Sequence, residues 1–213
     1  HRFTALERAK EQGIGHYFVP RYTRGVDTVE SKDNINKAYN LISTSKVRNE
    51  MIVDDVITCI TRKQTPVILT RFKEHAKFLY DALKGKADHV FLLYGDNSDK
   101  ENTEIRGRLK QVPGSESLVL VATGQKIGEG FDFPRLDVLM LAAPVSFEGR
   151  LEQYVGRLNR DYVGKEAVYV YDYIDSHVRY FDKMYAKRLR TYRKMGFSIW
   201  TQELQPKQII NAI

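Results

Sequence analysis

The sequence has very little cysteine and no long apolar run, and each absence excludes a class of protein. Cys59 is the only cysteine, which excludes an internal disulfide and a multi-cysteine zinc site and makes a reducing, cytoplasmic setting the expectation. The five histidines are scattered along the chain, so the sequence suggests no metal site. No apolar run approaches the roughly 18 residues that cross a membrane, and no signal peptide is visible. We therefore expect no membrane partner.

A further absence is the P-loop, G-x-x-x-x-G-K-[ST], which cradles nucleotide phosphates and helps to place Mg²⁺. The pairs Gly85-Lys86 and Gly164-Lys165 lack the upstream glycine and the following Ser or Thr. The segment "EMIVDD" (50–55) imitates a magnesium-binding acidic motif at the end of a strand, but its apolar spacing continues into the next turn and indicates a helix. The chain therefore has no complete phosphate-binding loop of its own.

What is present is an ordinary globular composition with a basic balance. Of the 213 residues, 42% are hydrophobic and 29% are charged, which is typical of a soluble domain. The length is enough for one well-buried domain with an appendage. A net charge of +7 favours a polyanionic partner such as nucleic acid, although it says nothing about the fold. Because the sequence begins with His1 rather than Met, we expect it to be a fragment of a longer chain.

Short apolar runs alternate with longer amphipathic or polar segments. The runs predict strands at residues 67–70, 89–95, 117–123, 136–144 and 167–174. The other segments predict helices at residues 46–62, 73–85, 99–111 and 152–162. This alternation indicates an α/β fold in which helices cover both faces of a parallel sheet, with ligands beyond the carboxyl ends of the strands. Residues 15–27 are expected to be extended chain.

The segment "ATGQKIGEGFDFPRLD" (122–137) is rich in glycine and follows the third predicted strand. Thr123 ends that strand, and glycines at 124, 128 and 130 allow the backbone to approach a phosphate or a sugar closely. Glu129 and Asp132 flank the last of these glycines. A flexible loop between two strands remains the alternative interpretation.

The segment "EQYVGRLNRDY" (152–162) is predicted to be a helix with one polar and one apolar side. At helical spacing Gln153, Arg157 and Arg160 share one side, and Gly156 leaves open backbone beside them. The other side can pack against the protein and comprises Leu151, Val155 and Leu158. Such a helix presents an amide and two guanidinium groups to a carboxylate, a phosphate or solvent.

Residues 178–194 predict a further helix with two separate stripes. One stripe is apolar and suits docking, with Val178, Phe181, Tyr185, Leu189 and Tyr192. The other stripe is cationic, with Arg179, Lys183, Lys187, Arg190 and Lys194. Cations on one face give affinity for nucleic-acid phosphates without sequence information. A solvated helix face remains the alternative interpretation.

Together these segments resemble the motifs of superfamily 2 helicases. "ATGQKIGEGFDFPRLD" looks like motif V, and "QYVGRLNR" (153–160) fits the motif VI pattern Q-x-x-G-R-x-x-R at every fixed position. "PVILTRFKEHAKFLYDAL" (66–83) resembles the motif IV region, in which a helix follows a strand. The likeness covers about residues 66–175 and is nearest to bacterial DEAD/DEAH-type helicases related to type III restriction helicase subunits.

The resemblance implies a RecA-like three-layer fold, as the second of two such domains in an ATP-dependent motor. Residues 1–45 would then be a connection from a missing N-terminal motor domain, residues 46–175 the RecA-like domain and residues 176–213 a basic helical extension. ATP and Mg²⁺ would bind mainly to the missing domain, so the chain alone is expected to hydrolyse ATP negligibly. The implied partners are that domain and nucleic acid, with DNA favoured over RNA.

The resemblance also implies roles for single residues. Arg157 and Arg160 would reach across the interdomain cleft to the γ-phosphate of ATP, with Gln153 near the nucleotide. The nucleotide side would also include Gly130, Asp132 and Gly156. Nucleic-acid contacts are expected from Thr123, from Thr70 and Arg71 at the end of the motif IV strand, and from Lys183, Lys187 and Arg190 of the basic helix.

Two other functions fit parts of the sequence. A non-catalytic module could bind nucleic acid through the basic helix. Such a module would not require Gln153, Arg157 and Arg160 at the spacing of motif VI. A small-molecule enzyme could use residues 124–130 as a cofactor cradle, but this loop reads G-x-x-x-G-x-G rather than G-x-G-x-x-G and lies near no evident catalytic dyad. Of the three functions, the second motor domain of a helicase explains the largest number of the candidate site residues.

Overall fold

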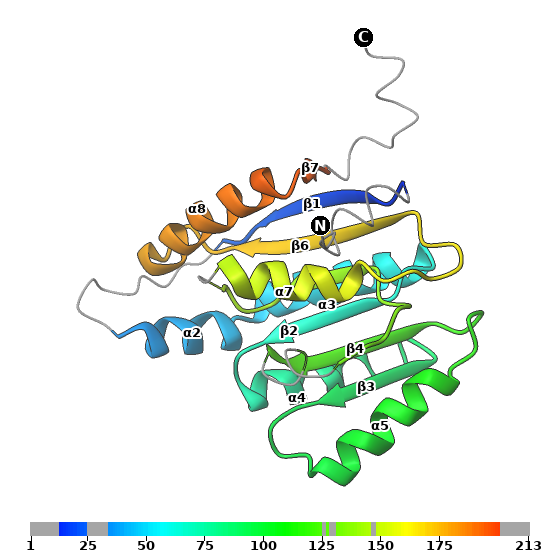
Figure 1. The fold of residues 1–213 in the computed structure, drawn as a ribbon. Helices are drawn as coiled ribbons and strands as arrows, with labels where there is room; N and C mark the ends of the chain where they lie inside the picture. Colours follow the sequence, from blue (N-terminus) through cyan, green and yellow to red (C-terminus); the bar gives the residue numbers. More distant parts are fainter. Residues whose placement is uncertain (1–12, 25–33, 125–126, 128–130, 146–147, 201–213) are drawn as a thin grey trace.

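The computed structural model describes residues 13–24, 34–124, 127, 131–145 and 148–200. Its centre is a sheet in the strand order β3-β4-β2-β5-β6-β1-β7 (Figure 1). The strands are β1 (Gly15–Tyr22), β2 (Pro66–Thr70), β3 (His89–Leu93), β4 (Leu118–Thr123), β5 (Val138–Leu141), β6 (Ala167–Ile174) and β7 (Ser198–Ile199). Neighbouring strands run parallel, so their carboxyl ends meet at one edge of the sheet.

Helices cover both faces of the sheet and its carboxyl edge. They are α2 (Ile35–Thr44), α3 (Lys46–Thr61), α4 (Lys73–Leu83), α5 (Asp99–Gln111), α7 (Glu148–Leu158) and α8 (Arg179–Lys194). α3 and α4 pack on one face, and α5, α7 and α8 pack on the other. The predicted α/β fold, a parallel sheet between two layers of helices, is confirmed.

Strand β2 shows why this sequence forms a sheet that is buried on both sides. Val67 and Leu69 join the apolar cluster under α5, α7 and α8, whereas Ile68 joins the cluster under α3 and α4. Because both faces are covered, the strand has no need of alternating polar residues. All residues of β2 and of its neighbour β4 are buried.

Helix α2 packs at the carboxyl edge of the sheet rather than on a face. Ala38, Tyr39 and Ile42 form a third apolar cluster with residues that follow β5 and begin α8. The Tyr39 hydroxyl donates to the carbonyl of Pro144 at 2.7 Å. The Arg71 guanidinium lies 4.5 Å from the centre of the Tyr39 ring, so α2 also reaches the end of β2.

Two buried arginine–aspartate pairs attach helices to the region of β6. One pair holds α3, on one face of the sheet, and the other holds α8, on the opposite face. Arg48 of α3 donates to both carboxylate oxygens of Asp175, at 2.9 and 3.1 Å. Arg188 of α8 donates in the same way to Asp172, at 2.7 and 2.9 Å. The two arginine side chains are 2% exposed and the two aspartate side chains 0%, so both pairs are closed to solvent.

Most of the predicted elements are confirmed. The helices expected at 46–62, 73–85 and 99–111, and the strands at 67–70, 89–95, 117–123 and 167–174, lie within a few residues of the observed bounds. The strand expected at 136–144 is shorter, because the chain turns after Leu141 and the Ala142 N–H donates back to the Met140 carbonyl. The helix expected at 152–162 begins earlier and ends earlier, at Leu158.

Strand β1 lies in residues 1–45, which the sequence assigns to a connection between domains. The sequence predicts extended chain there but not membership of the sheet. β1 pairs with β6 along all eight of its residues, whereas β7 pairs only with Tyr17 and Phe18. Pro20 lies beyond the part of β1 that β7 covers, where its missing N–H removes no ladder bond. Residues 15–22 therefore belong to the sheet.

Candidate nucleotide and nucleic-acid site

Helix α7 presents the first part of the motif VI pattern at the surface. Its apolar side is buried against the sheet and comprises Leu151, Val155 and Leu158. Gln153 is exposed, and Arg157, one turn later, is half-buried. A methyl group added at Gly156 would meet no atom within 4 Å, so the backbone beside these two side chains is open.

Arg160 does not lie on the helix face that the sequence predicts. α7 ends at Leu158, and the chain bends at Arg160 because Asn159 turns into the protein. The buried Asn159 accepts, through Oδ1, a hydrogen bond of 2.9 Å from Nε2 of His16 on β1. The predicted sharing of one helix face with Gln153 is therefore wrong for Arg160.

Arg160 instead meets Asp132 of the motif V segment. Arg160 Nε lies 3.4 Å from Asp132 Oδ1, and the two side chains are 48% and 59% exposed. The structure thus brings together two predicted site residues from segments that follow different strands. An exposed ion pair of this kind contributes little, so the guanidinium can exchange this one long contact for a phosphate, which it can bind through two parallel and shorter hydrogen bonds.

The start of the motif V segment is fastened to α7 through Gly124. The Tyr154 hydroxyl donates to the Gly124 carbonyl at 3.2 Å, and burial raises the pKa of Tyr154, which keeps this donor protonated. A Cβ atom at Gly124 would lie 2.6 Å from the Tyr154 hydroxyl oxygen. Gly124 thus has a packing role that its sequence context did not indicate. Gly128 and Gly130 lie outside the described residues.

Thr70 and Thr123 are paired neighbours at the carboxyl edge of the sheet, at the ends of β2 and β4. Both are buried, with exposed fractions of 4% and 8%. Thr70 Oγ1 lies 2.6 Å from Nδ1 of His75, whose Nε2 donates to Asn49 Oδ1 at 2.9 Å. Burial, with a smaller effect from the Arg48 charge, lowers the pKa of His75 to about 3. His75 is therefore neutral and accepts the hydrogen bond from Thr70.

This network directs the Thr70 hydroxyl into the protein, away from any nucleic acid at the surface. Arg71, the next residue, has an exposed side chain. It stacks on Tyr39, and its Nη2 lies 3.4 Å from Asn36 Oδ1. Of the two predicted contacts at the end of β2, Arg71 is the better placed.

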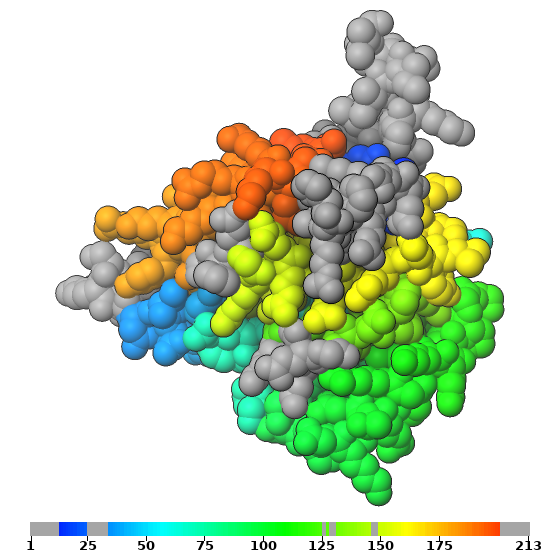
Figure 2. Space-filling view, in the orientation of Figure 1, coloured from blue at the N-terminus to red at the C-terminus, as the bar shows by residue number. Residues whose placement is uncertain are grey.

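Helix α8 separates its two predicted stripes. The apolar stripe is buried or partly buried and comprises Val178, Phe181, Tyr185, Leu189 and Tyr192. The cationic stripe is exposed and comprises Arg179, Lys183, Lys187, Arg190 and Lys194. Lys194 Nζ lies 3.3 Å from Glu152 Oε1 of α7, and Figure 2 shows α8 (orange) beside α7 (yellow-green) on this face of the molecule. The stripe thus continues the surface that begins on α7.

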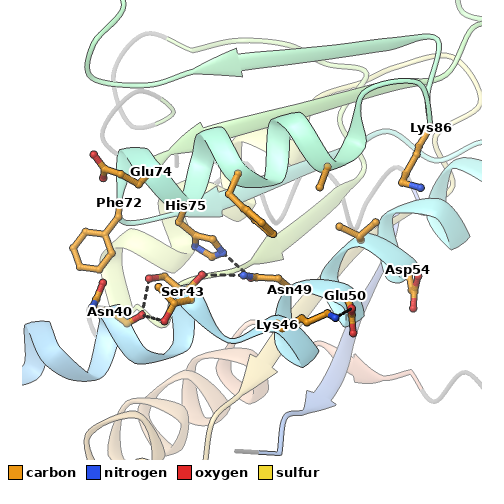
Figure 3. A pocket seen from close by; sticks show the side chains of 14 residues that line it. Asn40, Ser43, Lys46, Asn49, Glu50, Asp54, Phe72, Glu74, His75 and Lys86 are labelled. Atoms are coloured by element: carbon orange, nitrogen blue, oxygen red, sulfur yellow. Dashed lines mark hydrogen bonds and ion pairs between the residues drawn. The ribbon is translucent and has the colours of Figure 1, made fainter.

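A groove of about 1140 Å³ lies on the opposite face of the sheet, between α2, α3 and α4. Figure 3 shows His75 and Asn49 pointing toward each other inside it, with Phe72 at one end and Lys86 at the other. The predicted motifs do not indicate this groove. Its signal in the sequence is Phe78, an aromatic residue on the polar side of the predicted helix 73–85, which is 53% exposed. Because α7 packs on the other face, the groove is separate from the motif VI residues.

Two observations concern the described part of the chain as a whole. Within it, no group of three or more His, Cys, Asp or Glu side chains is placed to hold a metal ion. None of the described helices combines the length and the apolar character that a membrane crossing needs.

No family model matches the sequence, but it is similar to curated viral proteins. Transcript termination protein A18 of Yaba-like disease virus is 27% identical over 172 residues, which cover 76% of this chain and 35% of that protein. Putative helicase 161L of Invertebrate iridescent virus 6 is 30% identical over 162 residues, which cover 72% of this chain and 35% of that protein. The chain thus spans about a third of the length of these relatives.

Two solved structures share the fold of this chain. T4 UvsW gives a TM-score of 0.69 at 20% identity, over 93% of this chain and 41% of that chain. The E. coli DEAD-box protein SrmB, solved bound to regulator of ribonuclease activity A, gives a TM-score of 0.56 at 16% identity, over 91% of this chain and 95% of that chain. At these identities the likeness concerns the fold alone. The chain therefore has the RecA-like α/β fold.

Proposed function

We propose that this chain is the second motor domain of an ATP-dependent DNA helicase or translocase. The observation that carries the proposal is the surface pair of Arg160 and Asp132, which joins motif VI to motif V at 3.4 Å. A guanidinium in a weak, exposed pair is ready to bind a phosphoryl group, because the planar fork of arginine matches the geometry of phosphate oxygens. The RecA-like fold and a relative named as a putative helicase support the same assignment.

In this proposal Arg157 and Arg160 stabilise the charge on the γ-phosphate of ATP. Such arginine fingers contribute on the order of a thousandfold or more to the rate of phosphoryl transfer. The nucleotide side of the chain also includes Gln153, Asp132, Gly156 and, outside the described residues, Gly130. ATP and Mg²⁺ are held mainly by a P-loop domain elsewhere in the parent protein, and this chain orients its guanidinium groups toward them.

The proposed nucleic-acid surface consists of the cationic stripe of α8 and the carboxyl edge of the sheet. Lys183, Lys187 and Arg190 are exposed and suit contacts with phosphates, which fix position rather than read sequence. Arg71 and Thr123 add contacts at the sheet edge. Neither the fold nor the net charge distinguishes DNA from RNA as the ligand. The preference for DNA therefore rests on the resemblance to type III restriction helicase subunits.

A non-catalytic nucleic-acid-binding module is the second candidate function. The exposed cations of α8 favour it, because they need no ATP to hold phosphates. A binding module of this kind does not explain why Arg157 and Arg160 occur at the spacing of motif VI. ATP turnover therefore separates the two functions.

The test is ATP turnover by the chain alone and by the full-length parent protein, each with no nucleic acid, with DNA and with RNA. We expect negligible turnover by the chain alone, and turnover by the parent that DNA stimulates more than RNA. A parent without ATPase activity would favour the binding module. Turnover by the chain alone that Arg160→Ala abolishes would contradict the division between two domains. Stronger stimulation by RNA would overturn only the preference for DNA.

A further inference from the structure

Lys165 lies in the turn that follows motif VI and holds three backbone carbonyls with one ammonium group. Its Nζ donates to the carbonyls of Leu158 at 2.8 Å and Arg160 at 3.0 Å, and also to that of Pro134. Since an ammonium group has three N–H donors, these contacts use all of them. The sequence alone presents Lys165 only as a lysine without the rest of a P-loop.

The three carbonyls belong to the two segments that carry the proposed catalytic pair. Leu158 is the last residue of α7, where carbonyls lack helical partners and favour a cation. Arg160 is the proposed arginine finger, and Pro134 lies two residues after its ion-pair partner Asp132. Lys165 therefore restrains the backbone of both segments, the one that carries Arg160 and the one that carries Asp132.

The surroundings of Lys165 restrict the Arg160 backbone further. Asn159 is anchored to β1 through its side chain, so the chain is held immediately before Arg160 as well. Burial lowers the pKa of Lys165 to about 8, and the carboxylates of Asp137 and Asp161 oppose that shift. The ammonium form with three donors thus predominates at neutral pH. The result is a fixed backbone that carries a side chain 48% exposed.

We propose that Lys165 is a positioning residue, which holds the backbone of Arg160 so that the guanidinium projects to a fixed place for the γ-phosphate. This inference rests on the proposed function. Lys165 contacts the carbonyl of Arg160 rather than its guanidinium, so any effect on turnover has to pass through Arg160. A displacement of about 1 Å at a catalytic group can lower a rate on the order of a hundredfold, which sets the scale of the expected effect.

A double-variant cycle in the full-length parent protein tests this inference. Lys165→Met keeps the aliphatic stem and removes the donors, and Lys77→Met, at an exposed position of α4 on the opposite face, is the matched control. We expect Lys165→Met to lower kcat by about 10- to 100-fold with nucleic-acid affinity retained, and Lys77→Met to leave kcat unchanged. In an Arg160→Ala background, Lys165→Met should lower kcat no further.

The cycle separates the failure of this inference from the failure of the proposed function. An unchanged kcat for Lys165→Met, or an equal loss with and without the Arg160 side chain, would overturn the positioning role. Full turnover by Arg160→Ala alone would instead overturn the proposed function. Should Lys165→Met not fold, as judged by circular dichroism, Lys165→Gln retains two donors and goes through the same cycle under the same criteria.

Discussion

Arg188 of α8 and the Arg160 that follows α7 each pair with an aspartate, and the two pairs differ in burial and in geometry. Arg188 donates two hydrogen bonds to Asp172, at 2.7 and 2.9 Å, and its side chain is 2% exposed. Arg160 lies 3.4 Å from Asp132 and is 48% exposed. The closed pair leaves no place for another ligand, whereas the open pair can be exchanged. The first therefore serves the fold, and the second remains usable for chemistry.

Residue type and spacing identify the arginines in this sequence, but they do not show which arginine is structural and which is available to a ligand. Arg188 stands next to Lys187 in the sequence, yet Lys187 is exposed and Arg188 is buried. Its partner Asp172 belongs to β6, so the pair forms only when α8 packs on the sheet. Burial and the identity of the partner decide which arginine is structural.

Opening the closed pair should have the largest effect on stability. Arg188→Met leaves the Asp172 carboxylate buried without its partner, so we expect the free energy of unfolding to fall by about 3–5 kcal/mol. Arg160→Met, at the open pair, should change it by less than about 1 kcal/mol. Urea unfolding of both variants measures the two losses. Equal losses would show that burial does not distinguish the pairs.

Two glycines extend the comparison of closed and open sites. Gly124→Ala places a Cβ 2.6 Å from the Tyr154 hydroxyl oxygen, and we expect this overpacking to cost about 1–3 kcal/mol. Gly156→Ala fills open space within α7 and should add about 0.5–1 kcal/mol, since alanine loses less backbone freedom in a helix. Thermal unfolding measures both. A Gly124→Ala variant of unchanged stability would mean that the Tyr154 ring moves aside at little cost.

The buried His75 should make the stability of the fold depend on pH, unlike the exposed Arg160–Asp132 pair. Its pKa is about 3 in the folded chain, below the ordinary value of about 6.5 that applies when the chain is unfolded. Between these values the unfolded chain binds one more proton, so stability rises with pH and falls by about 1.4 kcal/mol for each pH unit below about 6.5. Urea unfolding across pH should show a smaller slope for His75→Gln. Identical pH profiles of the variant and the unchanged chain would exclude His75 as the titrating group.

The cationic stripe should show the smallest effect on the fold and a clear effect on binding. Lys183, Lys187 and Arg190 are exposed, so changing all three to Ala should alter stability by less than about 1 kcal/mol. The slope of log affinity for DNA against log salt concentration should fall by about 2 to 3, since each phosphate contact releases about one counterion. Filter binding at several salt concentrations measures the slope. An unchanged slope would show that the cationic stripe does not contact DNA phosphates and is a solvated helix face.

The sheet and its covering helices could be predicted because their signals are local. β4 is a continuous apolar run whose residues are all buried, and α5 has a strong start signal, a capping box between Ser98 and Glu101. β1 was harder to place, because its partner β6 lies far along the chain and Pro20 weakens its strand pattern. Pairings of that range leave no local trace in a sequence.

The candidate site could be predicted in its residues but not in its geometry. The spacing of motif VI identifies Arg157 and Arg160, yet no Gly or Pro between 157 and 163 marks the end of α7. The helix ends where contacts between residues distant in sequence begin. The main one is the hydrogen bond from the His16 side chain to that of Asn159, 143 residues away. The inward hydrogen bond of the Thr70 hydroxyl and the three contacts of Lys165 also appear only in the folded chain.

We expect Arg160 to bind a phosphate and to contribute little to the stability of the fold, and a single variant can test both expectations. The measurement is the ATP turnover of the full-length parent protein with Arg160→Ala at saturating DNA, with DNA affinity and unfolding temperature determined beside it. We predict that kcat falls about a thousandfold while affinity and unfolding temperature are retained. An unchanged kcat would contradict the proposed role and leave Arg160 as a surface residue of a nucleic-acid-binding module.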